Sequence, residues 1–170
     1  AAADALGINP YRVKLAAIEA EWETQKPPAA FTAFGIPNEA EQRTDYAIRI
    51  PWLLGLIATR STEQSVAGIG ELRKEAEVRI RNGMVAYAAL QKLKSGDRSA
   101  AAKAAFEHSR KDLGYGLLLK KYTPNVVDAT PEQIRRAAAD TIPRVAPLFW
   151  SFRIMVALGF LFLFIFAASF

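Results

Sequence analysis

Two charged residues in an otherwise apolar stretch, Lys14 and Glu19, are the first candidates for chemistry. They lie in residues 14–24, a segment rich in alanine, leucine and isoleucine that also contains Trp22. A carboxylate beside an apolar ring has a raised pKa, because burial disfavours its charged form, and such a group can accept a proton near neutral pH. The alternative is a solvated charged pair. The spacing favours that alternative, because five residues put two side chains about 140° apart on a helix.

Met155 and Arg153 form a second pair of candidates, at the start of an apolar run near the carboxyl end of the chain. A thioether can be an axial ligand of a haem iron, although methionine in a membrane helix usually serves packing. Arginine is costly at bilayer depth unless it is paired or reaches the surface. Two interpretations of Arg153 therefore stay open: snorkelling at the mouth of a helix, or contact with a haem propionate or another acid.

The chain contains no cysteine and a single histidine, His108. Disulfides, zinc–thiolate sites and iron–sulfur clusters within the chain are therefore excluded. His108 lies in a polar segment, residues 106–110, which is typical of a solvated helix, and we do not expect it to bind a ligand. A soluble helical enzyme has no support either, because the sequence contains neither a recognisable nucleophile–base pair nor a metal cluster.

The net charge of +5 arises from 22 lysine and arginine residues against 17 aspartate and glutamate residues. Basic side chains mostly lie close to acidic ones, as in residues 71–75 (ELRKE). This pattern is typical of a solvated helix face and not of a nucleic-acid site. We therefore expect no nucleic-acid partner.

Residues 154–170 form a run of 17 residues without a charge. As a helix this run is about 25 Å long, slightly short of a hydrocarbon core about 30 Å thick. Extending it back to Val145 gives ample length but includes Arg153. A buried helix of a soluble protein normally keeps a polar face, and none is present after Arg153. We predict an extramembrane domain over residues 1–144 and a transmembrane helix over residues 145–170.

The extramembrane part is predicted to be mainly α-helical. Alternating apolar residues predict short strands at residues 31–34 and 46–50 within an otherwise irregular segment. The apolar residues 52–57 either pack in a core or lie on the bilayer surface. Glycines beside Tyr115 mark a hinge or a packed bend, and packing is the favoured interpretation. Periodicity and capping signals predict helices over residues 11–25, 71–94, 98–121 and 130–140.

Three stretches of the chain resemble a known family. The first is residues 14–24 (KLAAIEAEWET), followed by AFT and FGIP; the second is residues 112–119 (DLGYGLLL), followed by YTPN; the third is residues 142–148 (IPRVAPL), leading into FRIM. Their order and spacing are similar to the long-loop form of subunit I of bacterial cytochrome bd oxidases, over about residues 13–170. Residues 1–12 depart from the family's pattern.

The resemblance implies both architecture and activity. The chain would be a helical extramembrane loop domain followed by one transmembrane helix of a multi-helix membrane subunit. In that family the loop helps to bind and oxidise quinol at the periplasmic face of the cytoplasmic (inner) membrane. Electrons pass to a low-spin haem b and then to a high-spin haem b and haem d, where oxygen is reduced to water. The implied partners are the rest of subunit I, subunit II, small accessory subunits and lipid, and the chain alone is not expected to be active.

The resemblance also implies roles for the four candidate residues. Lys14 and Glu19 match quinol-loop residues, so Glu19 would accept a proton from the quinol, and Lys14 would hold the other oxygen or restrain the acid. Met155 matches the axial ligand of the low-spin haem b, whose opposite ligand, a histidine, would come from outside this chain. Arg153 is expected at the same cofactor.

Two questions stay open on the sequence alone. The first is topology, because basic residues crowd the near side of the membrane helix (Arg135, Arg136, Arg144 and Arg153), which by the positive-inside tendency favours a cytoplasmic body. That tendency is weak for loops longer than about 60 residues, so the resemblance places the loop outside.

The second open question is a rival function, a single-span membrane-anchored helical interaction domain without redox activity. This rival predicts no haem.

Overall fold

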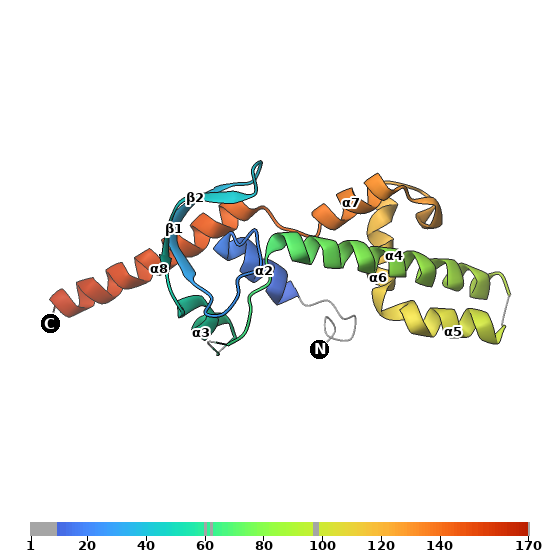
Figure 1. The fold of residues 1–170 in the computed structure, drawn as a ribbon, viewed down its shortest axis with the longest axis horizontal. Helices are drawn as coiled ribbons and strands as arrows, with labels where there is room; N and C mark the ends of the chain where they lie inside the picture. Colours follow the sequence, from blue (N-terminus) through green and yellow to red (C-terminus); the bar gives the residue numbers. More distant parts are fainter. Residues whose placement is uncertain (1–9, 60, 62, 97–98, 170) are drawn as a thin grey trace. The chain divides into compact units, whose positions relative to one another are not determined.

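The computed structural model describes residues 10–59, 61, 63–96 and 99–169. The chain divides into two compact units: unit 1 is built mainly from residues 72–141, and unit 2 from residues 11–71 and 142–170. Helices make up most of unit 1 and of the described chain, and unit 2 combines helices with a two-stranded sheet (Figure 1). The predicted mainly α-helical fold class is therefore confirmed. The membrane boundary expected between residues 144 and 145 stays a prediction.

Unit 1 is organised around α4 (Ile69–Lys94), which confirms the helix predicted over residues 71–94. α5 (Ala100–Ser109) runs back along α4 in the opposite direction (Figure 1). α7 (Pro131–Ala139) begins as predicted with a capping box, in which the side chains of Thr130 and Gln133 accept from each other's backbone N–H groups. The buried core consists of Ala76, Ile80, Leu119, Val126, Ile134, Ala137 and Ala138.

The continuous helix predicted over residues 98–121 is wrong. The break has a tertiary cause, because the carboxylate of Asp112 accepts hydrogen bonds from Arg79 Nε at 2.7 Å and from Asn82 Nδ2 at 3.2 Å. These bonds hold the chain against α4 at the point where a regular helix would leave it. In place of one helix, the chain after α5 forms η1 (Arg110–Asp112), α6 (Leu113–Leu117) and η2 (Leu118–Lys121), and η3 (Val126–Asp128) follows before α7.

Close packing of two glycines explains the glycine-rich bend beside Tyr115. A Cβ atom on Gly116 would lie 2.5 Å from the backbone carbonyl carbon of Gly83 in α4, which is closer than two carbon atoms can pack. A Cβ atom on Gly114 would meet nothing within 4 Å. The bend is therefore packed against α4, as favoured from the sequence, and is not an open hinge.

Unit 2 contains α2 (Pro10–Glu19), a β-hairpin, α3 (Leu53–Thr59) and α8 (Val145–Ala168). The strands β1 (Phe31–Asn38) and β2 (Arg43–Ile50) pair antiparallel, and register shifts between Thr32 and Ile36 bend β1. In Figure 1 the hairpin curves beside the first half of α8. The segment expected to be mostly irregular is therefore an ordered hairpin, with strands longer than predicted.

α3 contributes one side chain to the core of unit 2. Leu54 is buried with Ala29 and Val66, whereas Trp52, Leu56 and Ile57 are exposed. The apolar segment 52–57 thus packs in part as core and also presents an exposed apolar face, so both interpretations of its sequence stay open.

Helix α2 ends at Glu19 and not, as predicted, at Gln25. Ala20 adopts a left-handed backbone conformation with φ of 51°, and the N–H of Glu21 donates to the carbonyl of Ala16 at 2.9 Å, which closes a Schellman motif. Farther along, Gln25 and Val66 exchange backbone hydrogen bonds of 2.9 and 3.0 Å. Pairing with a distant segment therefore overrides the alanine-rich helical pattern.

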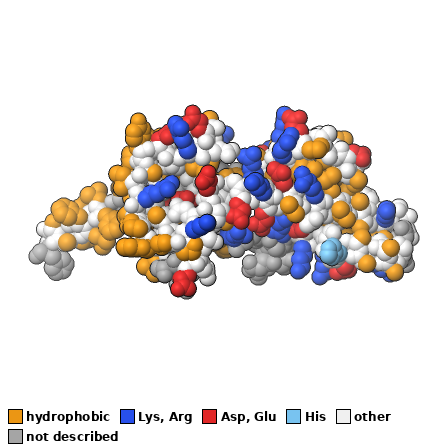
Figure 2. Space-filling view, viewed as in Figure 1, with side chains coloured by type: hydrophobic (Ala, Val, Ile, Leu, Met, Phe, Trp, Pro, Cys, Tyr) orange, Lys and Arg blue, Asp and Glu red, His pale blue; other side chains and the backbone are white. Residues whose placement is uncertain are grey.

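α8 confirms the helix predicted from Val145. Among the described residues it is the one helix long and apolar enough to cross a membrane. Its carboxyl-terminal half carries exposed hydrophobic side chains (Figure 2). Val145 and Phe149, near its start, are buried in unit 2. The same helix thus belongs to the packed body at one end and presents an apolar surface at the other.

We expect Gly116→Ala to destabilise unit 1 by roughly 1–3 kcal/mol, because the added methyl group forces two backbones apart. Gly114→Ala is the matched control and should be neutral or slightly stabilising, since alanine favours a helix over glycine by about 1 kcal/mol. Thermal unfolding of both variants, followed by circular dichroism, measures the difference. Equal midpoints for the two variants would contradict the close packing of Gly116 on Gly83.

Candidate functional site

Arg153 joins three elements of unit 2 through its guanidinium group. Nη1 donates to the backbone carbonyls of Ile18 at 2.7 Å and Phe149 at 3.2 Å, and Nη2 donates to the carbonyl of Thr32. Nη2 also forms an ion pair with Glu19 Oε2 at 3.1 Å. A single side chain therefore fixes the carboxyl end of α2, the start of β1 and α8 to one another.

The ion pair between Arg153 and Glu19 is buried, with 9% and 2% of the two side chains exposed. The guanidinium group lies over the ring of Phe149, with 3.4 Å between Cζ and the ring centroid. The rings of Phe31 and Phe152 lie 5.5 and 5.9 Å from the same atom. Of the interpretations left open from the sequence, the structure thus gives Arg153 a nearby acid as its partner.

Burial is the main influence on Glu19 and raises its pKa from 4.5 to about 7. The charge of Arg153 and hydrogen bonds from Arg153 and the backbone of Thr32 act in the opposite direction, while the charge of Glu21 adds to the rise. At neutral pH this carboxyl group can therefore both accept and release a proton. Because its pKa is higher in the folded protein than in the unfolded chain, its contribution to stability is complete below pH 4.5 and is lost as the pH rises through about 7.

Glu21 is a second buried carboxyl group, which sequence reasoning missed. It is 3% exposed, and its Oε1 atom has no hydrogen-bond partner among the described residues. Burial raises the pKa of Glu21, and hydrogen bonds from the side chains of Gln25 and Thr32 oppose that rise. In the sequence Glu21 is one of several charges on an expected helix. Only the left-handed turn at Ala20 directs Glu21 inward, and no local sequence pattern predicts that turn.

The structure does not bring Lys14 and Glu19 together. Lys14 is exposed on α2, whereas Glu19 is directed at Arg153. The apolar ring expected beside Glu19 is not Trp22 on the same helix, because α2 ends at Glu19 and Trp22 Nε1 donates instead to Thr44 Oγ1 at 3.1 Å. The aromatic surround of the ion pair comes from β1 and α8.

Met155 lies on a different face of α8 from Arg153, because residues two apart on a helix differ in direction by about 200°. Its side chain is 60% exposed, so the thioether is accessible to a haem supplied from outside this chain. The donor type fits an axial ligand of a low-spin haem. Ligation by Met155 and a haem contact of Arg153 both stay predictions.

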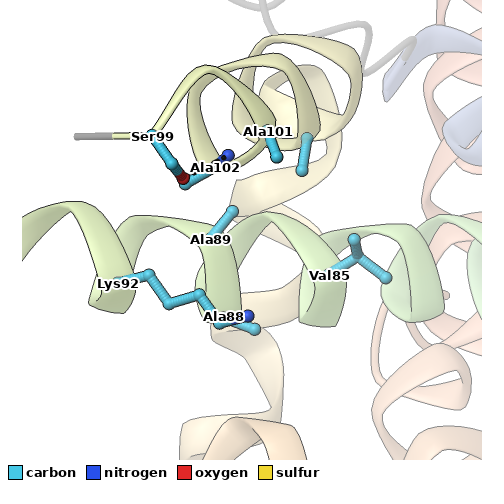
Figure 3. Close-up of a pocket in the computed structure, with 8 residues that line it drawn as sticks. Val85, Ala88, Ala89, Lys92, Ser99, Ala101 and Ala102 are labelled. Atoms are coloured by element: carbon cyan, nitrogen blue, oxygen red, sulfur yellow. Dashed lines mark hydrogen bonds between the residues drawn. The ribbon is translucent and has the colours of Figure 1, made fainter. Parts of the chain in front are cut away.

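The groove between α4 and α5 in unit 1 offers little chemistry. Its lining is mostly alanine with Val85, and Lys92 and Ser99 are its polar side chains (Figure 3). None of the described residues that line it carries a carboxyl or imidazole group. His108 is exposed on α5, in the solvated position that its sequence predicts. Within the described residues, the buried cluster of Glu19, Glu21 and Arg153 is therefore the stronger candidate site.

The fold and the site fit one class of protein: a helical membrane subunit in which a packed body is fixed to a long apolar helix by a buried ion pair. The sequence profile of the family described as cytochrome bd terminal oxidase subunit I matches residues 7–170, and the chain belongs to that family. The resemblance drawn from the three motifs is therefore confirmed.

A curated relative supports the same family. The chain is 42% identical over 151 residues to the cytochrome bd-II ubiquinol oxidase subunit 1 of Escherichia coli (strain K12). The match covers 89% of this chain and 29% of that protein, so the chain spans less than a third of its relative's length.

Arg153→Met removes the guanidinium group and leaves Glu19 buried without its partner. We expect the packing of α2 on α8 to weaken by about 3–5 kcal/mol, the usual effect of removing one member of a buried ion pair. Hydrogen exchange of the backbone amides in residues 16–21 measures this change locally. Adding Glu19→Gln should recover much of the loss, because the carboxylate that lost its partner is then neutral. Unchanged exchange in the single variant would contradict a structural role for the pair.

Proposed function

We propose that this chain forms the quinol-oxidising part of a cytochrome bd oxidase subunit I. The observation that carries the proposal is the buried Glu19–Arg153 pair, in which a carboxyl group with a pKa of about 7 lies within an aromatic surround. Family membership and the name of the ubiquinol oxidase relative support a quinol as substrate. Family membership also disfavours the rival interpretation as a single-span interaction domain.

A quinol loses two protons and two electrons as it becomes a quinone. Glu19 can take a proton from a quinol hydroxyl, because its carboxyl group titrates near neutral pH. Arg153 holds that carboxyl group in place through the ion pair. Lys14, exposed on α2, can bind a quinol oxygen from outside the buried pair.

A low-spin haem b bound at Met155 would supply the one-electron acceptor for this reaction. Met155 presents its thioether on an exposed face of α8, and Arg153, two residues earlier, ties that helix to the end of α2 that carries Glu19. Glu19 and the expected haem ligand are thus connected through Arg153 and α8. The high-spin haem b and haem d would belong to other parts of the assembly, where oxygen is reduced to water.

The proposed setting is the bacterial cytoplasmic membrane, with the loop on the periplasmic side. The exposed apolar half of α8 supports a membrane helix, and the resemblance to the family supports the side. The expected partners are the rest of subunit I, subunit II, small accessory subunits and lipid. The chain on its own is not expected to turn over oxygen.

Glu19→Gln should lower the rate of quinol oxidation by the assembled oxidase roughly 10²–10⁴-fold, the usual span for a general base. Lys14→Ala should mainly raise the apparent KM, because it removes binding shared by the ground and transition states. Both effects are measured as steady-state oxygen uptake with a soluble quinol.

An artificial electron donor that bypasses the loop provides the control for this pair of variants, and haem content should be normal in both. Glu23→Gln, which removes an exposed carboxylate in the same segment, should behave as the unmodified protein does. Unaltered quinol kinetics in Glu19→Gln and Lys14→Ala would refute the proposed roles, and equal loss with both donors would mean that the fold had been damaged.

Met155→Leu should abolish the low-spin haem signal or convert it to high spin. Leucine keeps the volume and apolarity of methionine, so folding should change little while the sulfur ligand is lost. The absorption spectrum of the assembled oxidase measures the effect. Met84→Leu, at the chain's other methionine, is the matched control. A normal low-spin spectrum in Met155→Leu would exclude the ligation.

A further inference from the structure

The two buried carboxyl groups at the end of α2 lie close to one another and share their surroundings. The charge of Glu21 acts on Glu19, and the charge of Arg153 acts on both. Burial raises the pKa of both groups; against it, the backbone of Thr32 lowers the pKa of Glu19 and the side chain of Thr32 lowers the pKa of Glu21. Glu19 and Glu21 are nearly inaccessible to solvent, at 2% and 3% exposed.

One carboxyl oxygen of Glu21 is buried without a hydrogen-bond partner among the described residues. A buried carboxyl group normally satisfies its oxygens with hydrogen bonds, and an orphaned oxygen calls for an explanation. Oε1 of Glu21 is orphaned within the described part of the chain, and the ion pair of Arg153 goes to Glu19 instead. An oxygen in this position is free to bind a proton without breaking an existing contact.

We propose that Glu21 is a proton relay for Glu19, so that the site can take both protons of one quinol. The inference rests on the proposed function, in which Glu19 accepts the first proton. One quinol O–H bond breaks, and its proton forms an O–H bond on the Glu19 carboxylate. Glu19 then passes that proton to Glu21, and is ionised again when the second O–H bond breaks.

The stoichiometry of this sequence is complete. One quinol becomes one quinone, its two protons are held on Glu19 and Glu21, and its two electrons leave one at a time to a haem acceptor. Without a relay, the second proton would meet a carboxyl group that is already protonated. A site with one acceptor would then have to release its proton to solvent between the two steps.

The charges around Glu21 suit a group that gains and loses a proton. Burial raises the pKa of Glu21 and favours its protonated form, whereas the charges of Arg49 from β2 and Arg153 from α8 favour the ionised form. Arg49 lies opposite Thr32 in the hairpin register, which places its charge at the strand that carries Thr32.

The test compares Glu21→Gln, which cannot titrate, with Glu21→Asp, which can, in the assembled oxidase. Glu21→Gln should lower kcat for quinol about 10²-fold, at the low end of the span for loss of a proton-transfer group, with turnover by the artificial donor unchanged. Glu21→Asp should restore most of the rate, and Glu23→Gln should have no effect. The acidic limb of the kcat/KM profile should move to lower pH in Glu21→Gln, because the charge that raises the pKa of Glu19 is gone.

A shift of the pH profile without a fall in kcat would overturn the relay, since Glu21 would then be only an electrostatic neighbour. Normal kinetics in Glu21→Gln together with a slow Glu19→Gln would also overturn it, while leaving the proposed function intact. Normal kinetics in Glu19→Gln would refute the proposed function itself.

Infrared difference spectroscopy of quinol oxidation gives a second measurement that does not depend on whether Glu21→Gln assembles. Two carboxyl C=O signals should appear in the unmodified oxidase, and Glu21→Asp should shift one of them. A single signal that Glu21→Asp leaves unchanged would overturn the proposal.

Discussion

A guanidinium group that is withdrawn from water requires hydrogen-bond acceptors, and this requirement of Arg153 organises unit 2. Its two Nη atoms donate to carbonyl groups in α2, β1 and α8 and to the carboxylate of Glu19, while Nε has no partner among the residues that the structure describes. The acceptors in α2 and β1 lie more than 100 residues from Arg153 in the chain. Those segments must therefore meet at one point, and the position of Glu19 relative to α8 follows from that meeting.

The turn of the chain directly after Glu19 depends on the same group of hydrogen bonds around Arg153. Ala20 takes a left-handed conformation that alanine adopts at a cost of about 1–2 kcal/mol, where glycine is the usual residue. The Schellman hydrogen bonds and the bonds from Arg153 to Ile18 and Glu19 hold it there. Strain of this kind persists only where the surroundings determine the conformation, and it is concentrated at functional sites. Here it turns Glu21 inward beside Glu19.

Local signals were sufficient to predict α4, α7 and α8, because regular apolar spacing, a capping box and a charge-free run are each contained in one segment. The end of α2 and the break at Asp112 could not be predicted, because each depends on a partner in a distant segment, as Asp112 does on Arg79, 33 residues away. Glu19 and Arg153 could each be chosen by residue type and resemblance. Their pairing could not be predicted, since 134 residues separate them and no local sequence pattern links them.

Stability alone does not account for a buried ion pair at this position. Withdrawing both charges from water costs several kcal/mol per ion, and apolar residues of similar volume are often as stable or more so. Apolar residues in place of the pair would also remove the cost of an arginine in an apolar helix. What such a pair could not provide is a carboxyl group that titrates at about pH 7 on the element bound to the expected haem helix. The balance between burial, which raises the pKa of Glu19, and Arg153, which lowers it, sets that value. The ion pair is therefore best explained as the means of keeping a proton acceptor usable inside an aromatic site.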